Sequence, residues 1–89
     1  MEYTVWKYAL KVGRTYVEMP SESAVLHCHE QHGEVCIWAG VIPDSPKRGR
    51  VFEVIGTGWL RAQSELYQYI GTAHMANGLV WHVFEVLGN

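Results

Sequence analysis

The stretch VLHCHEQHGEVCIWA (residues 25–39) decides the fold, because two largely apolar runs flank a dipeptide that suits a tight turn. Glycine adopts positive φ freely and histidine tolerates it better than most residues, so we expect His32 and Gly33 at the centre of a hairpin. Both runs are rich in β-branched or apolar residues, which is typical of β-strands. The stretch therefore predicts two antiparallel strands joined by a two-residue loop.

The expected turn determines which residues lie opposite one another. Counting outward from it, the pairs are Gln31–Glu34, Glu30–Val35, His29–Cys36, Cys28–Ile37 and His27–Trp38. Strand alternation then separates a core face from a second face. The core face holds Leu26, Cys28, Val35, Ile37 and Ala39, and the second face holds His27, His29, Cys36 and Trp38.

Three histidines and two cysteines within ten residues raise the question of a metal site. Because Cys28 faces the core, a four-ligand zinc site and a Cys28–Cys36 disulfide cannot form within this hairpin. A three-ligand site of His27, His29 and Cys36 stays open, against the alternative that these are solvent-facing or interface residues. Their spacing matches no regular zinc pattern, so we expect no metal and no cofactor. The second candidate binding site consists of His27, His29, Trp38 and His82.

The period of two continues on both sides of the hairpin. Strands are expected within residues 4–12, 13–20, 51–58, 67–73 and 79–89, a loop over PDSPKRGR (43–50), and at most one helical turn near 59–67. The segment VFEVIGT (51–57) recurs as VFEVLGN (83–89), which we interpret as common strand residues rather than a duplication. The chain has 89 residues, of which 48% are hydrophobic. It therefore predicts one compact all-β domain over 1–89, with six or seven short, mainly antiparallel strands in a sandwich or small barrel.

Charge and composition exclude several classes of function. The net charge of −2 provides no overall attraction to a nucleic-acid polymer or to an anionic membrane. The N-terminus lacks the pattern of a signal peptide, and no apolar run approaches the ~18 residues of a membrane span. No paired carboxylates, triad or convincing metal set appears, so we expect no enzyme activity. Apolar residues on both faces of 79–87 favour a homo-oligomer, with a dimer first.

The first candidate binding site joins two loops that carry cations and glycines. A strand that ends in Gly-Thr-Gly exposes backbone N–H groups, and neighbouring arginines and an aromatic ring suit a small anion or a nucleotide. The alternative is an ordinary bend beside a solvated loop. The predicted residues are Arg48, Arg50, Gly56, Thr57, Gly58, Trp59 and Arg61.

Several short motifs resemble a small family of phage and prophage proteins of unknown function. These are VWKYAL, MP followed by the 25–39 stretch, FEVIGTG, YIGT and the closing VWHVFEV, which together cover nearly the whole chain. The resemblance implies a viral accessory protein in the cytoplasm of a host cell and transfers no active-site residues. Two functions follow as expectations: sequestration of a small anionic ligand, such as a nucleotide-derived host-defence signal, or a protein-interaction module that inhibits a host protein or joins the virion through an aromatic face.

Overall fold

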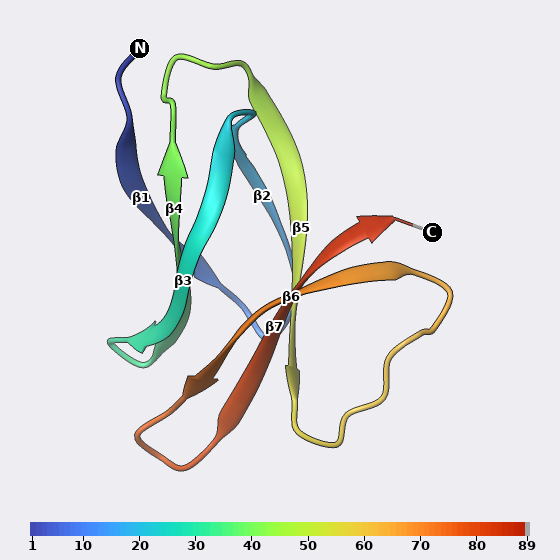
Figure 1. Ribbon diagram of the computed structural model, residues 1–89. Helices are drawn as coiled ribbons and strands as arrows, with labels where there is room; N and C mark the ends of the chain where they lie inside the picture. The colour runs from blue at the N-terminus through green and yellow to red at the C-terminus, as the bar shows by residue number, and fades with distance from the viewer. Residues whose placement is uncertain (89) are drawn as a thin grey trace.

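The computed structural model describes residues 1–88. These residues form seven β-strands joined by turns and loops, with no helix (Figure 1). The strands are β1 (Thr4–Leu10), β2 (Gly13–Pro20), β3 (Ser23–Gln31), β4 (Glu34–Val41), β5 (Lys47–Gly56), β6 (Leu66–His74) and β7 (Val80–Gly88). The all-β prediction is confirmed. At most one helical turn was expected near 59–67, where residues 59–65 form a loop and Leu66 begins β6. The predicted final strand also included Asn89, which lies outside the described residues.

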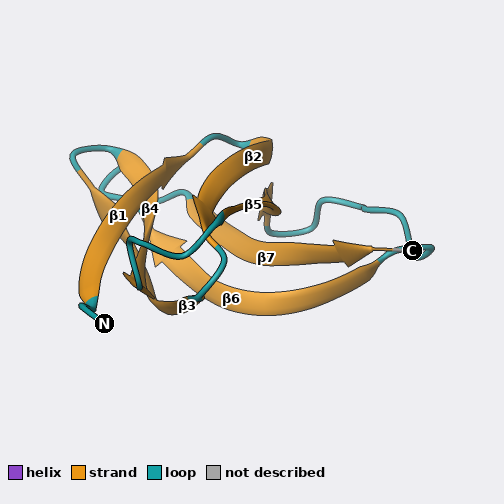
Figure 2. Ribbon diagram, turned by 90° about the horizontal axis from the view of Figure 1, so that it is seen from above, coloured by secondary structure: helices purple, strands orange, loops and turns teal. Residues whose placement is uncertain are grey.

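The strands form two antiparallel sheets that face each other as a small β sandwich and do not close into a barrel. One sheet has the order β1-β4-β3 and the other has the order β2-β5-β7-β6. Figure 2 shows β6 and β7 running on beyond the smaller sheet. Since residues 1–88 hold no helix, none of them forms a helix that could cross a membrane.

The hairpin of β3 and β4 has the predicted turn and register. His32 and Gly33 have φ angles of 54° and 81°, as a tight primed turn requires. All five predicted pairs, from Gln31–Glu34 to His27–Trp38, lie opposite each other. One assignment is wrong: Leu26 is 56% exposed, because a bulge between Val25 and His27 changes the alternation there. Val25 packs against the core in place of Leu26.

A second correction concerns residues 47–50, which were expected to be loop and instead begin β5. Lys47 lies opposite Pro20, and Arg50 lies opposite Val17 of β2. The prolines, the glycine and the cations of this segment favour a loop locally. Pairing with β2, which is distant in sequence, overrides that preference and extends the strand by four residues.

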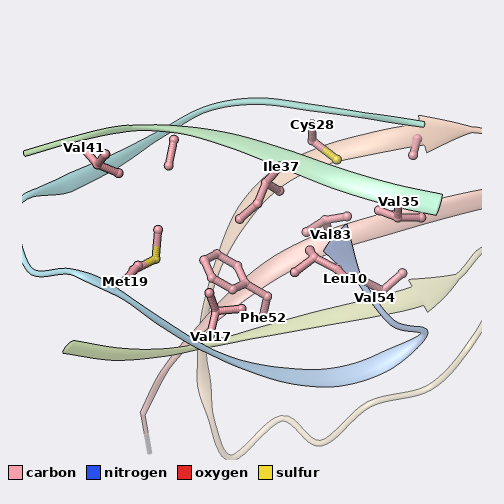
Figure 3. Close-up of a cluster of buried hydrophobic side chains, with 12 residues drawn as sticks. Leu10, Val17, Met19, Cys28, Val35, Ile37, Val41, Phe52, Val54 and Val83 are labelled. Carbon is pink, nitrogen blue, oxygen red and sulfur yellow. The ribbon is translucent and has the colours of Figure 1, made fainter. Parts of the chain in front are cut away.

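Every strand sends hydrophobic side chains into the space between the sheets (Figure 3). Burial of each such large side chain contributes about 1.5–3 kcal/mol. One shared core therefore holds the two sheets together. The buried cluster consists of Leu10, Val17, Met19, Cys28, Val35, Ile37, Ala39, Val41, Phe52, Val54, Ala73 and Val83.

The two sheets also meet at one side, where β3 approaches β6. A Cβ atom added to Gly71 would lie 2.8 Å from the Cβ atom of Cys28. A larger residue at this position would force β3 and β6 apart, so glycine permits their close approach. On β6, a register shift between Tyr69 and Gly71 accompanies the contact.

Candidate functional site

The first predicted site is distributed over distant parts of the larger sheet. Arg48 and Arg50 lie at the start of β5, whereas Gly56 is its last residue. Arg50 and Gly56 are therefore separated by roughly 20 Å at about 3.3 Å per residue. Thr57 and Gly58 form the turn that follows β5.

Arg50 points between the sheets, where it pairs with a carboxylate. Its Nε and Nη2 atoms each donate to Glu85 of β7 at 2.7 Å, and its Nη1 atom donates to the Ser23 carbonyl at 3.1 Å. The two side chains are only 14% and 10% exposed. These hydrogen bonds to Glu85 raise the pKa of Arg50, so the guanidinium stays charged. Arg50 therefore has a partner within the chain before any ligand arrives.

Arg61 lies on the opposite, outer face of the larger sheet. Its guanidinium carbon is 4.0 Å from the ring centre of Tyr67 and 3.9 Å from that of Phe84, which is the geometry of a cation–π contact. Near it, Arg14 of β2 pairs with Glu53 and with Glu65. Hydrogen bonds from Arg14 hold the pKa of Glu65 below its ordinary value. These contacts attach the 57–65 loop to the outer face of the sheet.

Three of the seven predicted residues come together at the other end of β5. Gly56, Thr57 and Trp59 border a hollow of about 280 Å³, which we call the tryptophan hollow. A Cβ atom at Gly56 would lie 2.7 Å from the Trp59 indole nitrogen, so the glycine lets that ring approach the strand closely. The Trp59 and Trp81 rings meet edge to face with centres 5.3 Å apart. The remaining lining residues are Gly78, Leu79 and Val80.

His82 of the second predicted site lies near the tryptophan hollow. Its Nε2 atom is 2.7 Å from the Thr57 hydroxyl, and its Nδ1 atom is 3.3 Å from the Thr72 hydroxyl. A hydroxyl can donate or accept, so each ring nitrogen can be either donor or acceptor in its contact. His82 thus connects the start of the 57–65 loop to β6.

The other three residues of the second site share one face of the smaller sheet. The ring of His27 stacks on that of His29 with centres 5.7 Å apart, and it lies 6.0 Å from the Trp38 ring. Cys36 lies on β4, as Trp38 does, but it is only 1% exposed. Within residues 1–88, no three histidine, cysteine or acidic side chains lie close enough to hold a metal ion. His82 belongs to the other sheet, so the second site is divided as well.

Arg50 and His27, which were predicted for different sites, border the same groove between β3 and β6. This groove has a volume of about 300 Å³, and Glu85 also lines it. Sequence reasoning missed both Glu85 and Trp81 as site residues. The repeated VFEV segment was the sequence signal that could have indicated them, because its two copies pair antiparallel. In this pairing Phe52 lies opposite Glu85. In the same register, the residue opposite Gly56 is Trp81.

Fold and site together define a small two-sheet antiparallel β protein with an aromatic hollow at one end of its larger sheet. Residues 1–88 match the family described as Domain of unknown function (DUF7352), and the chain belongs to this family. No curated protein and no solved structure matches the chain. The family assignment accounts for the whole described chain and leaves its function to be inferred from the site.

Proposed function

We propose that this protein is a non-catalytic binding protein that holds a small molecule with a flat ring in the tryptophan hollow. The observation that carries the proposal is the convergence of Gly56, Thr57 and Trp59 with Trp81 around one hollow. Its volume of about 280 Å³ is close to the lower end of the range for small-molecule sites.

The chemistry of the hollow supports a ring more than a charge. Trp59 is 52% exposed and offers its indole for stacking, which is worth about 1–3 kcal/mol per nucleobase. No residue that lines the hollow is charged, so an anionic group of the ligand would lie outside it. A nucleotide fits this division, with its aromatic base in the hollow and its phosphate outside. With the phage resemblance, we further propose that the protein sequesters such a ligand in the cytoplasm of a host cell.

Calorimetry with adenosine, AMP, cyclic dinucleotides and inorganic phosphate tests the proposal. Trp59→Ala should weaken the binding of ring-containing ligands about 10-fold or more, because stacking is lost. Trp6→Ala is the matched control, since Trp6 is also partly exposed but lies on β1 of the smaller sheet. If no ring-containing compound binds, or if both variants lose affinity equally, the hollow is not the site.

A protein-interaction module is the second candidate function, because hydrophobic side chains beside the hollow are exposed. Leu60 is 99% exposed and Leu79 is 51% exposed. Large apolar side chains exposed beside a hollow could contact a partner protein. Native mass spectrometry of the protein expressed with a candidate host protein separates the two functions. A small added mass supports ligand binding, whereas a stable complex that Leu60→Ser disrupts supports the interaction module.

A further inference from the structure

The groove between β3 and β6 is bordered by two strand edges that have no strand neighbour. β3 is the last strand of the smaller sheet, and β6 is the last strand of the larger one. The two strands touch where Gly71 meets Cys28. Toward the starts of both strands lies the groove of about 300 Å³. The strand residues along it are Ala24, Val25, Leu26 and His27 on β3 and Gln68, Tyr69 and Ile70 on β6.

Edge strands of this kind carry backbone groups that can pair with an added strand. Bulges occur on both edges, between Val25 and His27 and between Tyr69 and Gly71. A bulge interrupts a regular ladder, so pairing along either edge can continue for only a few residues. The occupant is therefore short.

The Arg50–Glu85 pair belongs to the lining of the groove, and its charges cancel. Arg50 uses three N–H groups within the protein, and a guanidinium has five, so two donors remain. The Glu85 carboxylate likewise keeps acceptor capacity beyond its two bonds to Arg50. An anion would meet the Glu85 carboxylate, and a cation would meet the Arg50 guanidinium. An uncharged group that both donates and accepts complements the pair, and the peptide group is such a group.

Exposed hydrophobic side chains flank these polar groups. Leu26 is 56% exposed and Tyr69 is 58% exposed, one on each strand. Side chains of an extended segment alternate, so one set would contact these walls while its backbone meets the strand edges and the ion pair.

We propose that the β3–β6 groove binds a short, uncharged, extended peptide segment of a partner protein through backbone hydrogen bonds. This site shares no lining residue with the tryptophan hollow, so it goes beyond the proposed small-molecule function. A segment bound there would connect the edges of the two sheets.

The test uses the full ¹⁵N-labelled chain and the capped peptide acetyl-Thr-Val-Thr-Val-amide as the probe. A few hydrogen bonds support a dissociation constant of about 1 mM. The peptide is therefore titrated to about 10 mM, roughly ten times that value. Amide signals of 24–27 and 68–70 should shift and saturate, while those of 56–59 should not. The same peptide with methylated backbone nitrogens should bind at least 10-fold more weakly, because its backbone N–H donors are gone.

Ala24→Trp should fill the groove and weaken peptide binding at least 10-fold. Ala24 is exposed, so the variant should fold, which its amide spectrum checks. The matched control is Ala62→Trp, an exposed position in the 57–65 loop, which should bind as the parent does. Trp59→Ala should also leave peptide binding unchanged, which separates this site from the tryptophan hollow. The absence of saturable shifts at 10 mM, or equal binding of the methylated peptide, would overturn the proposal.

Discussion

Arg50 and Glu85 carry opposite charges into the space between the sheets, and each depends on the other for hydrogen bonds. Removing charges from water costs several kcal/mol per ion, and only a close partner offsets that cost. Glu53 shows the same arrangement on the outer face: it is 6% exposed and accepts a hydrogen bond from Arg14 at 2.8 Å. Both buried carboxylates are thus stabilised by an arginine from a neighbouring strand.

Replacement of one partner should be more damaging than replacement of both. Arg50→Met leaves the Glu85 carboxylate buried without its donor, so the free energy of unfolding should fall by about 3–5 kcal/mol. Arg50→Met combined with Glu85→Met should recover most of this loss. Urea unfolding of the two variants measures the difference. A single variant that loses less than about 1 kcal/mol would show that the carboxylate is solvated in another way.

The cysteine thiols should react slowly in the native protein. Burial raises the pKa of Cys28 from 9.0 to about 11, and burial also raises the pKa of Cys36. At pH 8 the thiolate fraction of Cys28 is then roughly 100-fold lower than in the unfolded chain. Its labelling by a thiol reagent should be slower by at least that factor and should accelerate as the pH rises toward 11. Rapid labelling of the folded protein at pH 8, followed by mass spectrometry, would contradict this.

At the scale of elements, the two VFEV segments are neighbours in the larger sheet. They pair antiparallel from Val51–Val86, the first pair of the β5–β7 ladder, to Val54–Val83. In this register each phenylalanine lies opposite a glutamate, so Phe52 and Glu85 share the inner face while Glu53 and Phe84 share the outer face. The similarity of the segments therefore reflects similar roles in adjacent strands and requires no internal duplication.

Contact between the sheets at β3 and β6 depends on the absence of a side chain at Gly71. Gly71→Ala would place a Cβ atom 2.8 Å from that of Cys28, and separating the strands should cost about 1–3 kcal/mol. Thermal unfolding measures the loss. The control is Gln68→Ala, an exposed position on the same strand, which should change stability by less than about 0.5 kcal/mol. Equal stability of Gly71→Ala and the parent would mean that β3 and β6 separate freely.

At the scale of the whole molecule, the sandwich is thin, with extents of 42 × 32 × 15 Å. A domain of this size buries only roughly 60–65% of its unfolded surface. Part of the outer face of β7 is covered within the chain, since Arg61 and two tyrosines pack against Phe84. Hydrophobic side chains remain exposed elsewhere on the larger sheet, including Leu66 at 64% and Leu87 at 56%.

This exposed apolar surface continues to predict a homodimer, because a second copy would remove it from water. Light scattering at micromolar concentration should give twice the mass of one chain. Leu87→Lys should shift the equilibrium toward the monomer, because a charge would be buried in the contact. A single-chain mass for the unaltered protein at that concentration would contradict the prediction.

The sequence by itself determined the strand class, the His32–Gly33 turn and the register of the β3–β4 hairpin, because these depend on local periodicity and on the φ preferences of two residues. The tertiary structure alone decided the bulge that exposes Leu26. It also decided that residues 47–50 belong to β5, because their pairing partners on β2 lie about 30 residues away in the sequence.

The candidate sites divide in the same way. The Gly-Thr-Gly segment and Trp59 are close in sequence, so their proximity was predictable. Trp81 lies beside them only because the β5–β7 register places it opposite Gly56. Arg50 and Arg61 lie on opposite faces of the larger sheet. Strand pairing between distant segments sets which face and which end each side chain occupies, and no local pattern contains that information.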